Sequence, residues 1–308
     1  MTAFPAAVLK KFLEDGGSRL AALIAFWGFF SIFPLLLAFV SILGFVLEGD
    51  PGFQQDVVDS TIAQIPVIGD QLTRDATSLK GSGAALVVGI VGAVWAGLGV
   101  TLAIGSALDE IWGVPRMDRP DFVHSRLRGL AVLAVLGTAG VVSTAVVSLA
   151  RAGTIQPPVA GVLSFAGSAL IDLMVYVVAF RVLTSAAVSW RQVLPGAVAG
   201  TIGWLGLQTL GGLYVEQVVA RASETYGIFA AVIGLLSWLL VAAQLTLLAA
   251  EINVVADRRL WPRSFFGGLD AADRRAMRTA AQAEQRDPRQ RIVVTFAEPA
   301  GSEERPET

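Results

Sequence analysis

Six long apolar segments dominate this sequence. They run over residues 20–47, 84–108, 129–150, 159–183, 195–215 and 228–250. A helix needs about 20 mostly apolar residues to cross the hydrocarbon core of a bilayer, and it satisfies its backbone hydrogen bonds internally. Each segment is long enough. The sequence therefore predicts an all-α fold, a polytopic membrane helix bundle with six transmembrane helices.

Composition supports lipid as the solvent of this chain. Hydrophobic residues make up 54% of it and charged residues only 16%, whereas a soluble domain is roughly one quarter charged. The net charge of -2 argues against a nucleic-acid partner, which leaves a basic footprint on the proteins that bind it. The chain has no cysteine, which excludes disulfides, thiolate chemistry and cysteine metal sites. We expect no cofactor.

Basic residues set the orientation, because lysine and arginine are retained on the cytoplasmic side of a membrane. With both termini inside, the inner segments hold 19 of the 23 lysines and arginines. The first apolar run, about 28 residues long, exceeds the roughly 7–15 residues of a signal-peptide core and indicates an uncleaved anchor. We therefore expect an N-in/C-in protein with an inner segment at 1–19, a six-helix domain at 20–258 and a cytoplasmic tail at 259–308.

Two extramembrane regions differ in character. The outer loop, 48–83, carries six acidic residues and an amphipathic pattern that Pro66 breaks. Such a loop caps the outer helix ends or forms a gate or partner surface, and the sequence leaves both open. The tail is rich in arginine; its residues 270–286 have helix-forming composition, and about the last fifteen have the composition of a disordered segment.

Polar residues inside the spans mark the candidate functional interior. Asp172 lies near the middle of the fourth span, and Ser164 and Ser168 precede it at four-residue spacing on the same face. A carboxyl group there costs on the order of 3 kcal/mol to bury in lipid. Its face should therefore point into the bundle or into water.

The fifth and sixth spans add Gln208, Gln244 and Glu251. Together with Asp172 and Ser168 they define a candidate polar cavity, with Asp172 as proton carrier or substrate anchor. In the alternative interpretation Asp172 is protonated and hydrogen-bonded to a neighbouring helix, and the other polar groups only join helices.

Two backbone features affect packing. Pro34 interrupts the hydrogen-bond ladder of the first span and is a candidate hinge. Gly196 and Gly200 form a GxxxG step in the fifth span, which permits close contact between helix backbones. Such steps leave oligomerisation open.

Several of these segments resemble the YihY/virulence factor BrkB family of bacterial inner-membrane proteins. The resemblance covers residues 10–258 and runs through Phe26-Trp27 to Pro34, then Ala107 to Trp112, Val188 to Ala197, Tyr226-Gly227 and Ala250 to Asn253. The positions that match family motifs are Asp109, Trp112, Trp190, Arg191, Pro195, Gly196 and Asn253. The chain departs from the family at Asp109, where asparagine is usual, and at Thr184, where proline is typical.

The resemblance implies six helices and a multi-pass protein of the bacterial cytoplasmic (inner) membrane, but no activity. Some members carry a historical ribonuclease label. Metal-dependent RNA hydrolysis needs clustered His, Asp or Glu, and His124 is the one histidine, without a ligand-spaced partner. We therefore expect neither nuclease nor other enzymatic activity.

The leading hypothesis is a transporter-like bundle that moves a small solute, ion or lipid through a polar interior. The alternative is a non-transporting scaffold, or an envelope or regulatory factor. In either case the basic loop at 115–128 suits anionic lipid headgroups at the cytoplasmic face. The substrate stays unknown.

Overall fold

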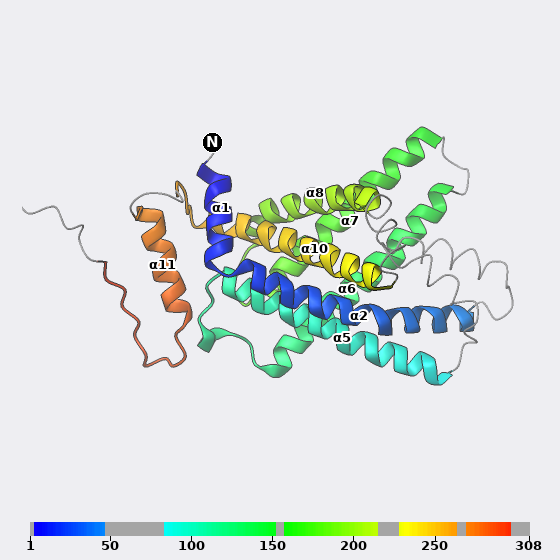
Figure 1. Ribbon diagram of the computed structural model, residues 1–308, viewed down its shortest axis with the longest axis horizontal. Helices are drawn as coiled ribbons and strands as arrows, with labels where there is room; N and C mark the ends of the chain where they lie inside the picture. The colour runs from blue at the N-terminus through cyan, green and yellow to red at the C-terminus, as the bar shows by residue number, and fades with distance from the viewer. Residues whose placement is uncertain (1–2, 47–82, 152–156, 215–227, 264–268, 297–308) are drawn as a thin grey trace, which may run out of the picture.

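The computed structural model describes residues 3–46, 83–151, 157–214, 228–263 and 269–296. Within these ranges the regular structure is helical, with no β-strand. Long helices run along one common axis, and two short helices, α1 (Ala3–Glu14) and α11 (Ala271–Ala283), lie across one end of it (Figure 1). We call this the α1/α11 end. The predicted all-α polytopic bundle is confirmed.

Six long helices coincide with the six apolar segments. They are α2 (Gly17–Val46), α5 (Gly83–Ile111), α6 (Phe122–Arg151), α7 (Pro157–Leu183), α8 (Trp190–Tyr214) and α10 (Ile228–Asp257). All but α6 contain a described stretch that is long and apolar enough to cross a membrane. The count of six spans and the N-in/C-in orientation remain predictions.

The long helices extend past their apolar segments at the α1/α11 end. There α2, α5, α6, α8 and α10 add three to seven residues to the predicted bounds, with the short 3-10 helix η1 (Arg116–Asp118) between α5 and α6. These extra turns carry most of the polar contacts described below. Hydropathy underestimated the helices because it registers apolar residues only, whereas protein contacts at this end satisfy the polar ones.

Contacts between helices follow a simple pattern. Helix α2 packs along α5, α10 packs against α8 and α2, and α6 packs against α7 (Figure 1). The closest approach is between α8 and α10, where a methyl group on Gly196 would lie 2.1 Å from the carbonyl oxygen of Ala249. Only glycine fits at that position. The GxxxG step therefore serves contact between helices of the same chain.

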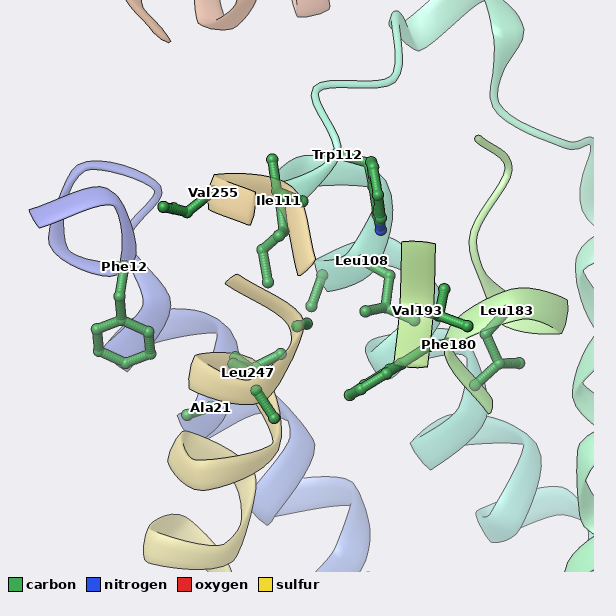
Figure 2. Packing of buried hydrophobic residues seen from close by; sticks show 14 of the residues in the cluster. Phe12, Ala21, Leu108, Ile111, Trp112, Phe180, Leu183, Val193, Leu247 and Val255 are labelled. Carbon is green, nitrogen blue, oxygen red and sulfur yellow. The ribbon is translucent and has the colours of Figure 1, made fainter. Parts of the chain in front are cut away.

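The largest buried apolar side chains gather toward the α1/α11 end. Figure 2 shows this cluster, in which α1 contributes Phe12 and the long helices contribute Leu108, Ile111, Phe180, Val193, Leu247 and Val255. Helix α1 thus closes the core of the bundle. The sequence did not predict α1, because residues 1–19 were assigned only as an inner segment.

Other predictions have mixed outcomes. The predicted helix in the tail is present as α11, where the Asp270 N–H donates to Asp273 Oδ2 at 3.2 Å. Helix α2 continues through Pro34, which lies against Gly92 of α5, so a hinge there stays a prediction. Residues 48–82 of the predicted outer loop and residues 297–308 of the tail lie outside the described residues.

Candidate functional site

A buried ionic cluster lies where α1 meets the end of α10. The ammonium group of Lys11 is 3.1 Å from Glu251 Oε2 and 2.5 Å from Asp15 Oδ2, and it also donates to the carbonyl oxygen of Ile111 at 2.9 Å. The Glu251 side chain is 0% exposed. Lys11 therefore joins three separate elements through one buried cation.

The electrostatics of this cluster follow from burial and proximity. Burial alone would lower the pKa of Lys11, but the carboxylates of Glu251 and Asp15 outweigh it and raise that pKa above its ordinary value. Burial raises the pKa of Asp15, and the positive charge of Lys11 only partly opposes this shift. Lys11 thus stays protonated, while Asp15 takes up a proton more readily than an exposed aspartate.

A charged cavity of about 490 Å³ opens beside the cluster. It lies between α1, the ends of α5 and α10, and α11, and its charged lining residues are Lys11, Glu14, Asp15, Arg19, Glu110 and Arg258. Its volume is in the usual range of ligand pockets, about 300–1,000 Å³. Because Lys11 lines the cavity and contacts Glu251, the buried carboxylate lies directly behind the cavity wall.

An arginine clamp fixes α11 to α1. The Arg263 side chain is buried, with Nε 2.6 Å from Asp273 Oδ1 and Nη2 2.6 Å from Glu14 Oε2. Lys10 adds a second bridge to Asp273 at 2.9 Å. Burial would raise the pKa of Asp273, but the hydrogen bonds from Lys10 and Arg263 outweigh it and hold that pKa below its usual range.

We predict that docking of α11 weakens in acid. Ionised Asp273 stabilises the clamp above its unfolded-chain pKa of about 3.9, and this contribution is lost as pH falls through the lower folded-state pKa. The chain has no cysteine, so spin labels can be placed at Ser18→Cys and Gln282→Cys. The distance distribution between them should be narrow at pH 7 and broad in acid, below the lowered pKa of Asp273.

The control variant for this prediction is Asp273→Asn, which should broaden the distribution at both pH values. A second label pair on Leu170→Cys and Ile202→Cys, in α7 and α8, should stay unchanged and exclude general acid unfolding. A narrow distribution in Asp273→Asn would contradict the assignment.

The positions that match family motifs form contacts between helix ends. Asp109 of α5 accepts hydrogen bonds from the Ser185 N–H at 2.6 Å and the Ser185 hydroxyl at 2.9 Å. Asn253 Oδ1 of α10 accepts the Gly196 N–H at 2.6 Å. Both side chains are almost fully buried: Asp109 joins α5 to the connection that follows α7, and Asn253 joins α10 to α8.

Other motif positions also lie near the α1/α11 end. Trp112 is buried, and Arg258 donates to its carbonyl oxygen. Arg191 is exposed at the start of α8, with its guanidinium 5.3 Å from the ring centroid of Trp190. Pro195 is inside the first turns of α8, next to Gly196.

Residues 8–266 match the family model described as Virulence factor BrkB. The chain belongs to the virulence factor BrkB family. This confirms the resemblance seen in the sequence. A relative in Bacillus subtilis (strain 168), named "Putative ribonuclease-like protein YfkH", is 26% identical over 266 residues, which cover 80% of this chain and 92% of the relative. No solved structure matches the chain.

Membership of the BrkB family and five described apolar helices make this protein an integral, multi-pass membrane protein in contact with lipid. Asp109 was noted in the sequence as a departure from the family pattern, and among the described residues its carboxylate accepts hydrogen bonds from Ser185 and Thr184. An acceptor suffices at that position, so the departure is compatible with the contact.

The five residues of the predicted polar cavity lie in different surroundings. Asp172, Ser168 and Gln244 are half-buried, Gln208 is exposed, and Glu251 is fully buried beside Lys11. None of them lines the charged cavity or either of the two cavities described further below. The shared polar cavity therefore stays a prediction.

The described residues contain no group of three or more His, Asp or Glu side chains placed to hold a metal ion. His124 is exposed, and its Nδ1 lies 2.5 Å from Asp121 Oδ1 in the same turn. It lies in the first turn of α6, and contact with lipid headgroups stays a prediction.

Sequence reasoning missed the partners of Glu251. Lys11 entered only as a charge that sets orientation, although a carboxylate in an apolar span needs a nearby cation. Arg263 and Asp273 belonged to a tail in which no contact was expected. The available signal was the presence of Glu251 in an otherwise apolar segment, which required a basic residue at the same end of the bundle.

Proposed function

We propose that this BrkB protein is a transporter of the bacterial cytoplasmic membrane that moves a small solute, ion or lipid. The observation that carries the proposal is the charged cavity at the α1/α11 end, which closes on the buried pair of Lys11 and Glu251. Ionisable groups inside a membrane bundle are costly and commonly mark transport pathways. In this proposal the pair of Lys11 and Glu251 closes the transport path at the α1/α11 end.

The orientation in the proposal puts the α1/α11 end in the cytoplasm. The basic residues of this end are Lys10, Lys11, Arg19 and those within residues 116–128. An excess of basic residues on one side is typical of the cytoplasmic face. The same residues meet anionic lipid headgroups there.

Asp172 is the proposed carrier deeper in the path. It lies one helical turn before Tyr176, whose hydroxyl is 3.3 Å from Thr246 Oγ1 of α10. This contact supplies polar groups between α7 and α10 at the depth of Asp172. In the proposal, a proton or solute moves from Asp172 toward Glu251 past the contact between Tyr176 and Thr246.

One observation favours the alternative of a regulatory scaffold. The clamp through Arg263 holds α11 against α1 and keeps part of the tail folded on the membrane domain. A docked helix of this kind offers a surface to cytoplasmic partners. Neither hypothesis includes nuclease activity.

Flux measurements test the transport proposal. Vesicles containing the purified protein are loaded with pyranine for protons, with lucigenin for chloride, or with NBD-labelled phosphatidylglycerol for lipid movement. We expect the wild type to move at least one probe and Asp172→Asn to lower that flux at least tenfold, because the amide cannot carry a proton or a charge.

Two further variants sharpen the test. Arg19→Glu reverses a charge at the cavity and should alter the preference between cation and anion probes. Arg289→Gln, on an exposed residue of the tail, should leave flux unchanged. Absence of flux for all three probes would refute transport, and unchanged flux in Asp172→Asn would remove that residue from the path.

A further inference from the structure

Two adjoining cavities follow the side of the bundle formed by α2, α5 and α6. The first, about 450 Å³, is mostly apolar and lies between α2 and α5, with Arg126 of α6 at one edge. The second, about 260 Å³, has more polar side chains in its lining, among them Arg119, Ser125 and Arg128. Both are lined by Leu102 and Ser106. We call the two together the α2/α5/α6 groove.

The apolar part of the groove is built around two tryptophans. The rings of Trp27 and Trp95 meet edge to face, 5.7 Å apart. Trp27 lies so close to α5 that a methyl group on Gly99 would be 2.2 Å from its ring. Trp95 is 66% exposed, and Leu23 beside it is also exposed. This part of the groove therefore opens sideways to lipid.

Arg126, at the edge of the first cavity, forms no salt bridge with an acidic side chain of the described residues. The guanidinium of Arg126 lies 3.3 Å from the ring centroid of Phe122 and donates to the Phe122 carbonyl oxygen. By contrast, Arg119 is bound to Glu110 at 3.1 Å, and Arg128 donates to Ser185 Oγ at 3.2 Å. Among the three groove arginines, Arg126 is thus the one whose guanidinium contacts no side-chain acceptor of the described residues, and it is available to an incoming anion.

The carboxylate of Asp109 lines the second cavity, and neighbouring groups compensate its negative charge. The carboxylate of Asp109 accepts the two hydrogen bonds from Ser185, and Arg128 lies on the same serine. An anion at Arg126 therefore meets a locally neutralised aspartate.

The length of the groove fits one leaflet of a bilayer. Eleven residues of α5 separate Trp95 from Ser106, which is about 16 Å at 1.5 Å per residue. Half of the hydrocarbon core is about 15 Å. Trp95 thus lies near the depth where an acyl chain ends if Ser106 lies near the depth of the phosphate.

We infer that the α2/α5/α6 groove binds one anionic glycerophospholipid of the inner leaflet. Its phosphate contacts Arg126 with the hydroxyls of Ser106 and Ser125, and one acyl chain lies against Trp27 and Trp95. This inference rests on the proposed contact of the α1/α11 end with anionic headgroups and narrows it to one site. It does not depend on transport.

The test compares lipid binding by the full chain in detergent micelles. Phosphatidylglycerol or phosphatidylcholine is added, bound lipid is counted by native mass spectrometry, and the Tm is measured in parallel. We expect phosphatidylglycerol to bind at least tenfold more tightly than phosphatidylcholine. Arg126→Ala should abolish this preference, and Trp95→Ala should weaken binding of both lipids.

Matched controls distinguish lipid binding in the groove from nonspecific electrostatic attraction of anionic lipid to the protein. Arg191→Ala removes an exposed arginine that also contacts an aromatic ring but lies outside the groove, and Phe165→Ala removes an exposed aromatic residue of α7. Both should bind phosphatidylglycerol like the wild type. Inorganic phosphate and glycerophosphoglycerol, which lack acyl chains, should not raise the Tm.

The outcomes distinguish the groove site from the broader proposal that the α1/α11 end contacts anionic headgroups. If the wild type shows no preference for phosphatidylglycerol, the contact with anionic headgroups and the groove site are both refuted. If the preference exists but Arg126→Ala and Arg191→Ala lower it equally, general attraction stands and the groove site is refuted. Stabilisation by inorganic phosphate alone would refute the lipid as the ligand.

Discussion

Replacing Lys11 by methionine is expected to lower the free energy of unfolding by about 3–5 kcal/mol. The substitution leaves the fully buried Glu251 without its cation, 3.1 Å away in the wild type, and removes the donor to the carbonyl oxygen of Ile111. A buried charge that loses its partner costs far more than an exposed one. Unfolding by SDS titration in mixed micelles measures the loss.

Two comparisons isolate the cause. Arg116→Met breaks an exposed bridge to Glu284, with both side chains more than 40% exposed, and should change stability far less than Lys11→Met does. The double variant Lys11→Met/Glu251→Leu removes both buried charges and should regain most of the loss. If Lys11→Met lowers the free energy of unfolding no more than Arg116→Met does, the buried cluster does not stabilise the bundle.

Gly196→Ala should destabilise the protein by about 3 kcal/mol or more, although alanine favours helices over glycine. The new methyl group would lie 2.1 Å from the Ala249 carbonyl oxygen and 2.5 Å from Asn253 Nδ2. Since the first of these atoms belongs to a helix backbone, α8 and α10 must move apart. Their separation would also break the hydrogen bond from Gly196 to Asn253. The Tm in detergent micelles reports the change.

The control lies in the same helix. Among the described residues, no atom outside the neighbouring backbone of α8 lies within 4 Å of a methyl group added to Gly206, so Gly206→Ala should be neutral or stabilising by up to about 1 kcal/mol. A Tm for Gly196→Ala equal to that of Gly206→Ala would show that α8 and α10 are not held at the distance seen in the structure.

Most of the helical framework could be predicted from the sequence, because an apolar run of about 20 residues has few alternatives to a membrane helix. Helix ends were less accessible. The end of α10 extends to Asp257 because Asn253 and Glu251 find partners in α8 and α1. Hydropathy contains no information about such partners, since they come from distant parts of the chain.

The candidate site was predictable only in part. Glu251 was selected from its polarity in an apolar span. It was grouped with Gln244 by seven-residue spacing within the sixth span and with Asp172 only as another polar residue of the spans. Periodicity places residues on a face of one helix and cannot identify the neighbouring element that pairs with them. The position of α1 decides that Glu251 faces Lys11, and a short helix with mixed composition gives little signal.

The bridge between Lys11 and Glu251 also orders events during biosynthesis. The two residues are 240 positions apart, and a ribosome that adds about 5–20 residues per second needs on the order of tens of seconds to travel between them. Lys11 is thus translated long before its partner exists. When Glu251 enters the membrane, Lys11 is already present as its cation. Helix α10 can then pair with α1, the first helix to be translated among the described residues.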